Sequence, residues 1–189
     1  MARAFPGIKV ASVDLPAGID VARASHRGYA GNVARAAGAL PQPVSLCGWS
    51  MGGLVVLQAS RRVRPHTIIL LEPSPPAEVQ GVNLAVEIKN STFDPEETYG
   101  PFPHGIRSRP ESSRARAERK RGTSVPSVPC PSLVVYGDEY REHRGKRIAL
   151  LYNSFELYFP GVNHWGLVRS AAVRAAIARC LPRQQPFVS

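Results

Sequence analysis

The strongest structural signal in this chain lies in residues 44–57, which read Val44-Ser45-Leu46-Cys47-Gly48-Trp49-Ser50-Met51-Gly52-Gly53-Leu54-Val55-Val56-Leu57. A short apolar run stops at Gly48, and a run rich in Leu and Val, which favours a helix, begins after Gly52. Between them, Ser50 is flanked at minus two and plus two by glycine. This G-x-S-x-G pattern between strand and helix is typical of a sharp turn that lifts a serine hydroxyl out of a sheet. The glycines are expected because strand and helix approach closely there only without a Cβ between them.

A serine hydroxyl at such a turn becomes a nucleophile only when a base takes its proton and a carboxylate orients that base. Two later loops offer these groups. Gly137-Asp138-Glu139 follows a predicted strand that ends at Tyr136, and His164 follows one that ends at Phe159. The three groups would all lie at the C-terminal ends of strands, the edge where open α/β sheets build their sites. The bland alternatives are a packed histidine and an aspartate that serves as turn residue or helix cap.

Strand and helix patterns alternate through most of the chain. Apolar or β-branched runs predict strands at Ile8–Leu15, Pro43–Cys47, Thr67–Leu71, Ser132–Tyr136 and Phe155–Phe159. Helices are predicted at Tyr29–Leu40, Met51–Arg62, Arg141–Tyr152 and Leu167–Leu181. This alternation favours an α/β fold with a mainly parallel sheet of about five strands and flanking helices.

The composition changes between residues 74 and 130, which hold many prolines and few apolar clusters. Short helices are conceivable at Val82–Ile88 and Arg114–Arg121. A stretch this long between strands is usually a functional lid or a disordered insertion. The sequence therefore predicts a core formed by residues 1–73 and 131–189, with residues 74–130 inserted as a lid or cap.

The chain resembles the α/β-hydrolase superfamily, in its esterase, lipase and non-haem haloperoxidase branch. The residues that carry the resemblance are Gly48-Trp49-Ser50-Met51-Gly52-Gly53, the segment Ser12-Val13-Asp14-Leu15-Pro16, and His164 at the start of the last predicted helix. The resemblance implies Ser50 as nucleophile, His164 as general base and then acid, and Asp138 as the orienting acid. Because the family more often has its acid three residues after the glycine, where this chain has Tyr140, Glu139 is the alternative acid.

Within that resemblance the Met51 amide would donate one hydrogen bond to the oxyanion, and Trp49 and Trp165 would line the substrate pocket. No metal or other cofactor is expected. The implied function is a serine hydrolase that cleaves a carboxylic ester or thioester through an acyl-enzyme; perhydrolysis would use the same residues. The alternative is a non-catalytic or weakly active protein of this fold that binds a small ligand or partner.

Composition narrows the classes of partner. The chain has 189 residues, 43% hydrophobic residues and a net charge of +10, without a run long enough to span a membrane or a secretory signal. Much of the charge lies between Arg107 and Arg121, but no nucleic-acid-binding motif accompanies it, so neither nucleic acid nor membrane is expected as a partner. This basic segment would either be solvated or attract acidic substrates. The three cysteines are expected to be buried, reduced thiols in a cytoplasmic protein, and His26, His66, His104 and His143 to be solvated.

The resemblance also indicates a missing part. In the family, a loop beginning His-Gly donates the second oxyanion hydrogen bond, and one more strand lies between those corresponding to Ile8–Leu15 and Val44–Cys47. Nothing before Ile8 supplies either, so the sequence predicts an N-terminally shortened core. Either Ile8–Leu15 pairs directly with Val44–Cys47, or the exposed sheet edges pair with another chain. Weak activity, marginal stability and self-association would follow.

Overall fold

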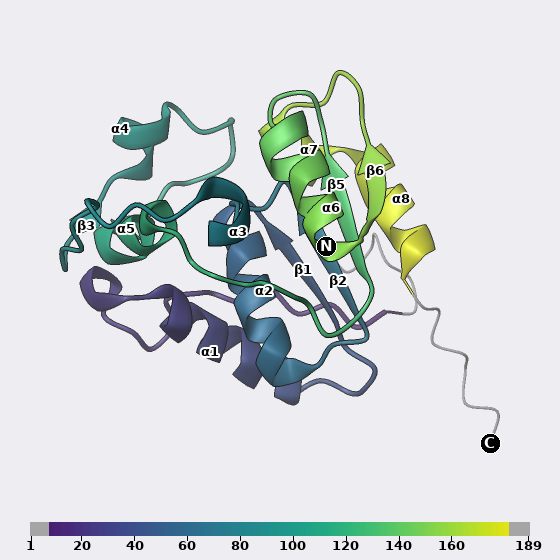
Figure 1. The fold of residues 1–189 in the computed structure, drawn as a ribbon, viewed down its shortest axis with the longest axis horizontal. Coiled ribbons are helices and arrows are strands. Elements are labelled where there is room, and N and C mark those ends of the chain that lie inside the picture. Colours follow the sequence, from purple (N-terminus) through teal and green to yellow (C-terminus); the bar gives the residue numbers. More distant parts are fainter. Residues whose placement is uncertain (1–7, 182–189) are drawn as a thin grey trace.

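The computed structural model describes residues 8–181, and its centre is a four-stranded sheet (Figure 1). The strands are β1 (Ser45–Trp49), β2 (Thr67–Leu71), β5 (Ser132–Tyr136) and β6 (Phe155–Tyr158), in the order β1-β2-β5-β6. All three pairings are parallel, with Gly48 opposite Leu70 and Val134 opposite Glu156. The C-terminal ends of the strands therefore meet at one edge of the sheet. The prediction of an α/β fold with a parallel sheet is confirmed, although with four strands in the described residues.

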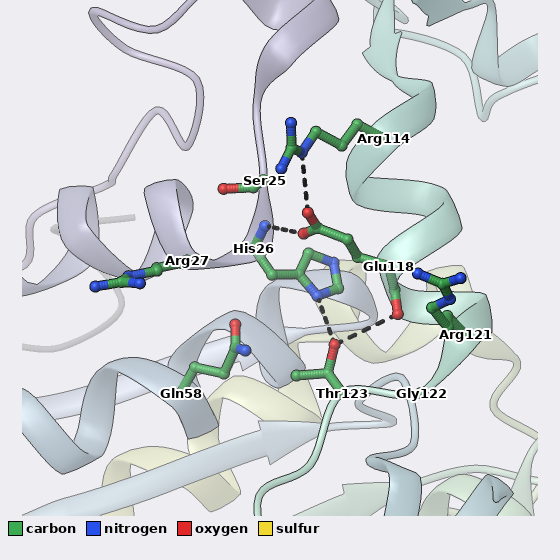
Figure 2. A pocket seen from close by; sticks show the side chains of 9 residues that line it. All are labelled: Ser25, His26, Arg27, Gln58, Arg114, Glu118, Arg121, Gly122 and Thr123. Atoms are coloured by element: carbon green, nitrogen blue, oxygen red, sulfur yellow. Dashed lines mark hydrogen bonds and ion pairs between the residues drawn. The ribbon is translucent and has the colours of Figure 1, made fainter. Parts of the chain in front are cut away.

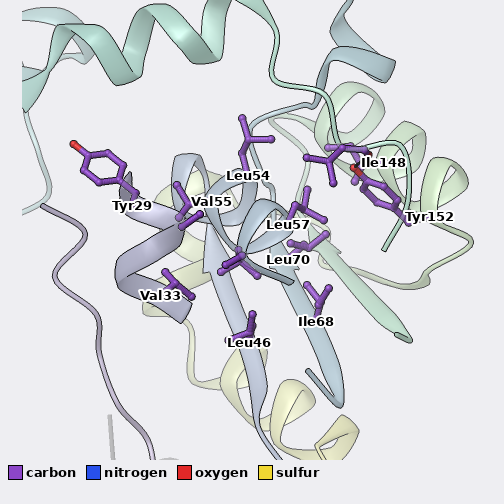
Figure 3. Close-up of a cluster of buried hydrophobic side chains, with 14 of the residues drawn as sticks. Tyr29, Val33, Leu46, Leu54, Val55, Leu57, Ile68, Leu70, Ile148 and Tyr152 are labelled. Atoms are coloured by element: carbon purple, nitrogen blue, oxygen red, sulfur yellow. Dashed lines mark hydrogen bonds between the residues drawn. The ribbon is translucent and has the colours of Figure 1, made fainter. Parts of the chain in front are cut away.

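Helices cover both faces of this sheet. On one face lie α1 (His26–Gly38), α2 (Met51–Val63) and α6 (Arg147–Tyr152), and on the other α7 (His164–Arg169) and α8 (Ala171–Cys180). Successive residues of a strand point to opposite faces. Accordingly Ile68 and Leu70 pack against the first group, as Figure 3 shows, while Ile69 and Leu71 pack against the second. Burial on both faces explains the continuous apolar runs of β2 and β5.

The segment between β2 and β5 forms small elements of its own. These are α3 (Ala77–Gln80), β3 (Thr92–Phe93), α4 (Pro95–Tyr99), β4 (Glu111–Ser112) and α5 (Ser113–Arg121). The helix expected at Arg114–Arg121 is confirmed as α5, which lies against α1 (Figure 1). The helix expected at Val82–Ile88 is wrong. Gly81, at φ +84°, ends α3, and the Asn83 side chain then accepts a hydrogen bond from Ala85 N and so forms a turn.

The strand predicted at Ile8–Leu15 is also wrong. Residues 8–14 have no regular structure, and residues 8–13 line a groove beside β1. The pairing of this segment with β1 is wrong too, because β2 is the only strand paired with β1 in residues 8–181. A β-branched, alternating segment becomes a strand only when a neighbouring strand takes its backbone hydrogen bonds. A 3₁₀ turn, η2 (Val21–Arg23), follows this segment and leads into α1.

Two further predictions need correction near the C-terminal side. The helix expected at Leu167–Leu181 is divided into α7 and α8 by Ser170, which takes an extended conformation and caps α8 by accepting a hydrogen bond from Val173 N. The helix expected at Arg141–Tyr152 is present, but its first part, η3 (Arg141–Lys146), is π-helical.

The three cysteines are free thiols, and Cys47 and Cys180 are exposed rather than buried. Among the helices of residues 8–181, none has the length and apolarity that crossing a membrane demands.

Candidate active site

Ser50 lies in the tight turn between β1 and α2, and its backbone is strained there. It has φ 52° and ψ −124°, a region that costs a residue with a side chain about 1–3 kcal/mol. Its N–H donates to Leu71 O at 3.1 Å and its carbonyl accepts from Gly53 N at 3.0 Å, so β2 and α2 hold the turn from both sides. The hydroxyl is thereby carried at the C-terminal edge of the sheet, at the N-terminus of a 13-residue helix.

Glycines allow strand and helix to approach closely around this turn. Only one of the two glycines of the G-x-S-x-G motif is needed for this close approach. A Cβ on Gly48 would lie 2.5 Å from Gly52 O, and one on Gly53 would lie 2.5 Å from Pro73 Cβ. A Cβ on Gly52 would meet nothing within 4 Å. The expectation is therefore right for the glycine at minus two, while Gly53 rather than Gly52 is the second glycine whose missing side chain matters.

His164 begins α7, and its ring bonds to a carboxylate outside the site residues predicted from the sequence. Its Nδ1 lies 2.6 Å from Glu72 Oε2, with the Glu72 side chain fully buried and that of His164 12% exposed. The other carboxylate oxygen, Oε1, accepts a hydrogen bond of 2.8 Å from Gly137 N. Buried carboxylates are costly unless hydrogen-bonded, and both oxygens of Glu72 have partners.

Glu72 reaches this position because it directly follows β2, the neighbour of β1 in the sheet. Its N–H donates to Val135 O at 2.9 Å. Its φ is +37°, which makes Glu72 a second strained residue, after Ser50, at this edge of the sheet. One sequence signal marks Glu72: it is the first charged residue after the buried run Thr67–Leu71. Polar groups at the ends of parallel strands converge on one edge.

Asp138 and Glu139, the two acids expected to orient His164, contact other groups. The Asp138 carboxylate accepts hydrogen bonds from the Tyr158 hydroxyl and from Gly161 N, and these hold its pKa below the usual value. Glu139 Oε2 accepts a 3.0 Å hydrogen bond from His164 N, so it caps the first turn of α7. Both carboxylates are exposed and hold the loop that carries His164, whereas neither touches its ring nitrogens in the described structure.

Aromatic rings surround His164. The Trp49 ring lies 4.6 Å from the His164 ring, centroid to centroid, and Trp49 Nε1 donates to His164 O at 3.1 Å. Trp165 packs on Trp49 at 4.7 Å, and Phe102 of the segment between β2 and β5 packs on Trp165 at 4.9 Å. Tyr140 meets the His164 ring edge-on at 5.1 Å. The structure therefore brings Trp49 and Trp165 together beside His164, and adds Phe102 and Tyr140.

Ser50 is placed near His164 through its neighbour in the chain. Trp49, whose ring packs against the His164 ring, directly precedes Ser50. Among residues 8–181 no hydrogen bond joins Ser50 Oγ to the His164 ring. Catalytic hydrogen bonds are often long before substrate binds. Met51 N opens α2 beside the serine. The described part of the chain contains no group of three His, Cys, Asp or Glu side chains placed to hold a metal ion.

Comparison with known proteins gives matches in structure only. No family model and no curated protein matches the sequence. A monoacylglycerol lipase from Paleococcus ferrophilus is similar, with 14% identity, a TM-score of 0.52 and coverage of 82% of this chain and 76% of that chain. The esterase domain of a Rhodothermus marinus protein is also similar, with 16% identity, a TM-score of 0.53 and coverage of 86% of this chain and 70% of that chain. A thermophilic esterase from Thermogutta terrifontis has 19% identity and a TM-score of 0.52, and the match covers 86% of this chain and 74% of that chain. At these identities, what the chain shares with these proteins is the fold.

Proposed function

We propose that this chain, which has the α/β-hydrolase fold, is a serine hydrolase that cleaves a carboxylic ester or thioester. Ser50 is its nucleophile, His164 its general base and then acid, and Glu72 the carboxylate that orients His164. The observation that supports this most is the buried 2.6 Å contact between Glu72 and the His164 ring, next to the strained turn that carries Ser50. Glu72 replaces Asp138 in the role expected from the sequence.

In this proposal Glu72 Oε2 accepts a hydrogen bond from Nδ1–H of His164, which leaves Nε2 as the base for the Ser50 hydroxyl. The serine oxygen attacks the carbonyl carbon, and the alcohol or thiol leaves with the proton that His164 returns. Water then attacks the acyl-enzyme with His164 again as base, which releases the acid and restores Ser50. Gly137 N, which donates a hydrogen bond to Glu72 Oε1, holds the carboxylate in place during both half-reactions.

The oxyanion would be stabilised by the Met51 amide at the N-terminus of α2. The second donor that the family takes from a His-Gly loop has no counterpart among residues 8–181 of this sequence. Removing one such donor costs about 2.7–4 kcal/mol of transition-state stabilisation, or roughly 100- to 1000-fold in rate.

The aromatic cluster would form the wall of the substrate pocket. Trp49 and Trp165 come from the core, whereas Phe102 comes from residues 74–130, and its contact with Trp165 supports a lid role for this segment. Rings of this kind bind apolar acyl or alcohol groups by burial of area.

The test is hydrolysis of short p-nitrophenyl esters and an acyl thioester by the wild type and by Ser50→Ala. We expect saturable hydrolysis by the wild type and only background rates with Ser50→Ala. An unfolded variant would be recognised by its circular dichroism. Equal rates for the two folded proteins would reject the proposal.

The second candidate is a protein of this fold that binds a ligand without turning it over. It is favoured by one observation: in the described residues, Ser50 Oγ makes no hydrogen bond to His164. The same assay separates the two candidates, because Ser50-dependent turnover excludes a role in binding alone.

A further inference from the structure

A second cavity lies away from Ser50, between the first turn of α1, the middle of α2 and the end of α5 (Figure 2). Its volume is about 310 Å³, which is at the lower end of the range for small-molecule sites, roughly 300–1,000 Å³. The residues that matter for its chemistry are His26, Gln58, Arg114, Glu118, Arg121 and Thr123. None of them belongs to the cluster around His164.

His26 is buried in the wall of this cavity, at 1% exposure, and not solvated as the sequence suggests. Its Nδ1 lies 3.3 Å from the Thr123 hydroxyl, whose oxygen lies 3.5 Å from Glu118 O. In the tautomer in which Nδ1 donates to Thr123, Nε2 is a hydrogen-bond acceptor. Burial, with a contribution from Arg119, lowers the pKa of His26 to about 4, so the ring is neutral at pH 7.

Three buried polar atoms around the cavity have no partner among the described residues. They are the acceptors His26 Nε2 and Gln58 Oε1 and the donor Arg121 Nε. Buried polar atoms are nearly always hydrogen-bonded in folded proteins, so three at one cavity call for an explanation. Their chemistry specifies the missing group: it accepts a hydrogen bond from a guanidinium and donates one to a neutral imidazole or an amide oxygen.

The charge around the cavity favours an anion. Glu118 is already engaged, because its Oε1 accepts from Arg114 Nε at 3.1 Å and its Oε2 from His26 N at 2.9 Å. Arg121 is the second cation in the wall and has no carboxylate partner within residues 8–181, since its Nη2 donates to Leu84 O. The N-terminus of α1, a 13-residue helix, adds its positive dipole end on the same side. The Arg27 guanidinium points away from the cavity in Figure 2 and takes no part.

We propose that this cavity binds a small phosphate-type anion that carries a hydroxyl hydrogen, with Arg121 bonding the anionic oxygens and His26 Nε2 or Gln58 Oε1 accepting the hydroxyl hydrogen. Two ligands share this chemistry, free hydrogenphosphate and a phosphate ester with hydroxyl groups. Sulfate has similar shape and charge but no hydrogen to donate at neutral pH, so the acceptors would be left unpaired against it.

The experiment is isothermal titration calorimetry of the full chain at pH 7.5 with hydrogenphosphate, glycerol 3-phosphate and sulfate. We expect saturable binding of hydrogenphosphate with a Kd at or below about 1 mM, and a preference over sulfate of roughly fivefold or more. Tighter binding of glycerol 3-phosphate than of hydrogenphosphate would identify the ester as the ligand class; the reverse order would identify the free anion.

Matched variants locate the site. Arg121→Gln should weaken hydrogenphosphate binding by about tenfold or more, because it removes a charge-assisted bond. Lys120→Gln makes the same change of charge at an exposed neighbour outside the cavity and should have little effect. Gln58→Leu keeps all charges and should reduce the preference for hydrogenphosphate over sulfate. Equal affinity for the two anions, an equal loss in Arg121→Gln and Lys120→Gln, or no saturable binding by a folded wild type would each overturn the proposal.

Discussion

Glu72 fixes His164 from a fully buried position, while Asp138 lies on the surface and holds the Tyr158–Gly161 loop. Glu72→Gln should keep the shape of the site but remove the charge that orients the ring and stabilises the imidazolium. We expect kcat/KM for a p-nitrophenyl ester to fall by about 10³- to 10⁴-fold. Asp138→Asn, the matched change at the acid predicted from the sequence, should stay within roughly threefold of the wild type. A larger loss in Asp138→Asn than in Glu72→Gln would contradict the proposal and indicate that Asp138 orients His164.

His26 gives a second prediction at this scale, on stability. Its pKa falls from 6.5 to about 4 in the folded chain, chiefly through burial. Between these values the unfolded chain binds a proton that the folded chain does not, so stability falls as pH falls from 6.5 toward 4, by about 3 kcal/mol at most.

Urea unfolding at several pH values measures this effect. His26→Phe should flatten the curve between pH 6.5 and 4, and the exposed His104→Gln should leave its slope unchanged. A slope that survives His26→Phe would assign the loss of stability to other groups.

Sequence patterns indicate which residues could act, but not which carboxylate meets the imidazole. Ser50 and His164 are candidates because of a local motif and of their order along the chain. The partner of His164 depends instead on which neighbouring loop reaches its ring. Glu72 follows β2 and so lies beside β1 in the sheet, although 92 residues separate it from His164. That adjacency is a property of sheet order, which no short motif encodes.

At the scale of elements, the close packing of β1 against α2 can be tested at the three glycines of the turn between them, Gly48, Gly52 and Gly53. Gly48→Ala and Gly53→Ala would each place a Cβ 2.5 Å from another atom, against the Gly52 carbonyl and Pro73. We expect each to lower the free energy of unfolding by about 1–3 kcal/mol.

Gly52→Ala is the control, because a Cβ there meets nothing within 4 Å. It should leave stability unchanged or raise it by up to about 1 kcal/mol, since alanine favours a helix over glycine. Urea unfolding of the three variants checks the order; a loss in Gly52→Ala equal to the others would contradict the geometry of the turn.

The elements that could be predicted well from sequence are those whose burial is complete. Thr67–Leu71 and Ser132–Tyr136 are strands with the predicted bounds, because both faces of each are covered and most of their residues are apolar. Ile8–Leu15 has a comparable pattern but no strand beside it among the described residues, so its backbone stays irregular. Such an outcome depends on tertiary partners rather than on local propensity.

For the whole molecule, the free edge of β1 has the largest consequence. Within residues 8–181 no strand pairs with this edge, and beside it runs a mainly apolar groove of about 470 Å³, lined by Val10, Val13, Cys47, Leu167 and others. An unpaired edge next to apolar surface favours pairing with another chain. We therefore propose that the protein self-associates through this edge.

The net charge of +10 opposes such association, so added salt should strengthen it by screening. Sedimentation velocity across the micromolar range should show a concentration-dependent dimer that increases with salt. Cys47→Lys would place a charge in the groove beside the edge and should shift the protein to monomer. A wild type that stays monomeric at every concentration and salt level would contradict this use of the edge.

The central claim is that Ser50, activated by His164 and Glu72, is the nucleophile of this molecule. Labelling with a fluorophosphonate, followed by mass spectrometry of the labelled peptide, tests it most directly, because the probe reports the nucleophile without knowledge of the substrate. The account predicts one adduct on Ser50, none on folded Ser50→Ala, slow labelling of Glu72→Gln and near-normal labelling of Asp138→Asn. Labelling at another residue, or equal labelling of wild type and Ser50→Ala, would contradict it.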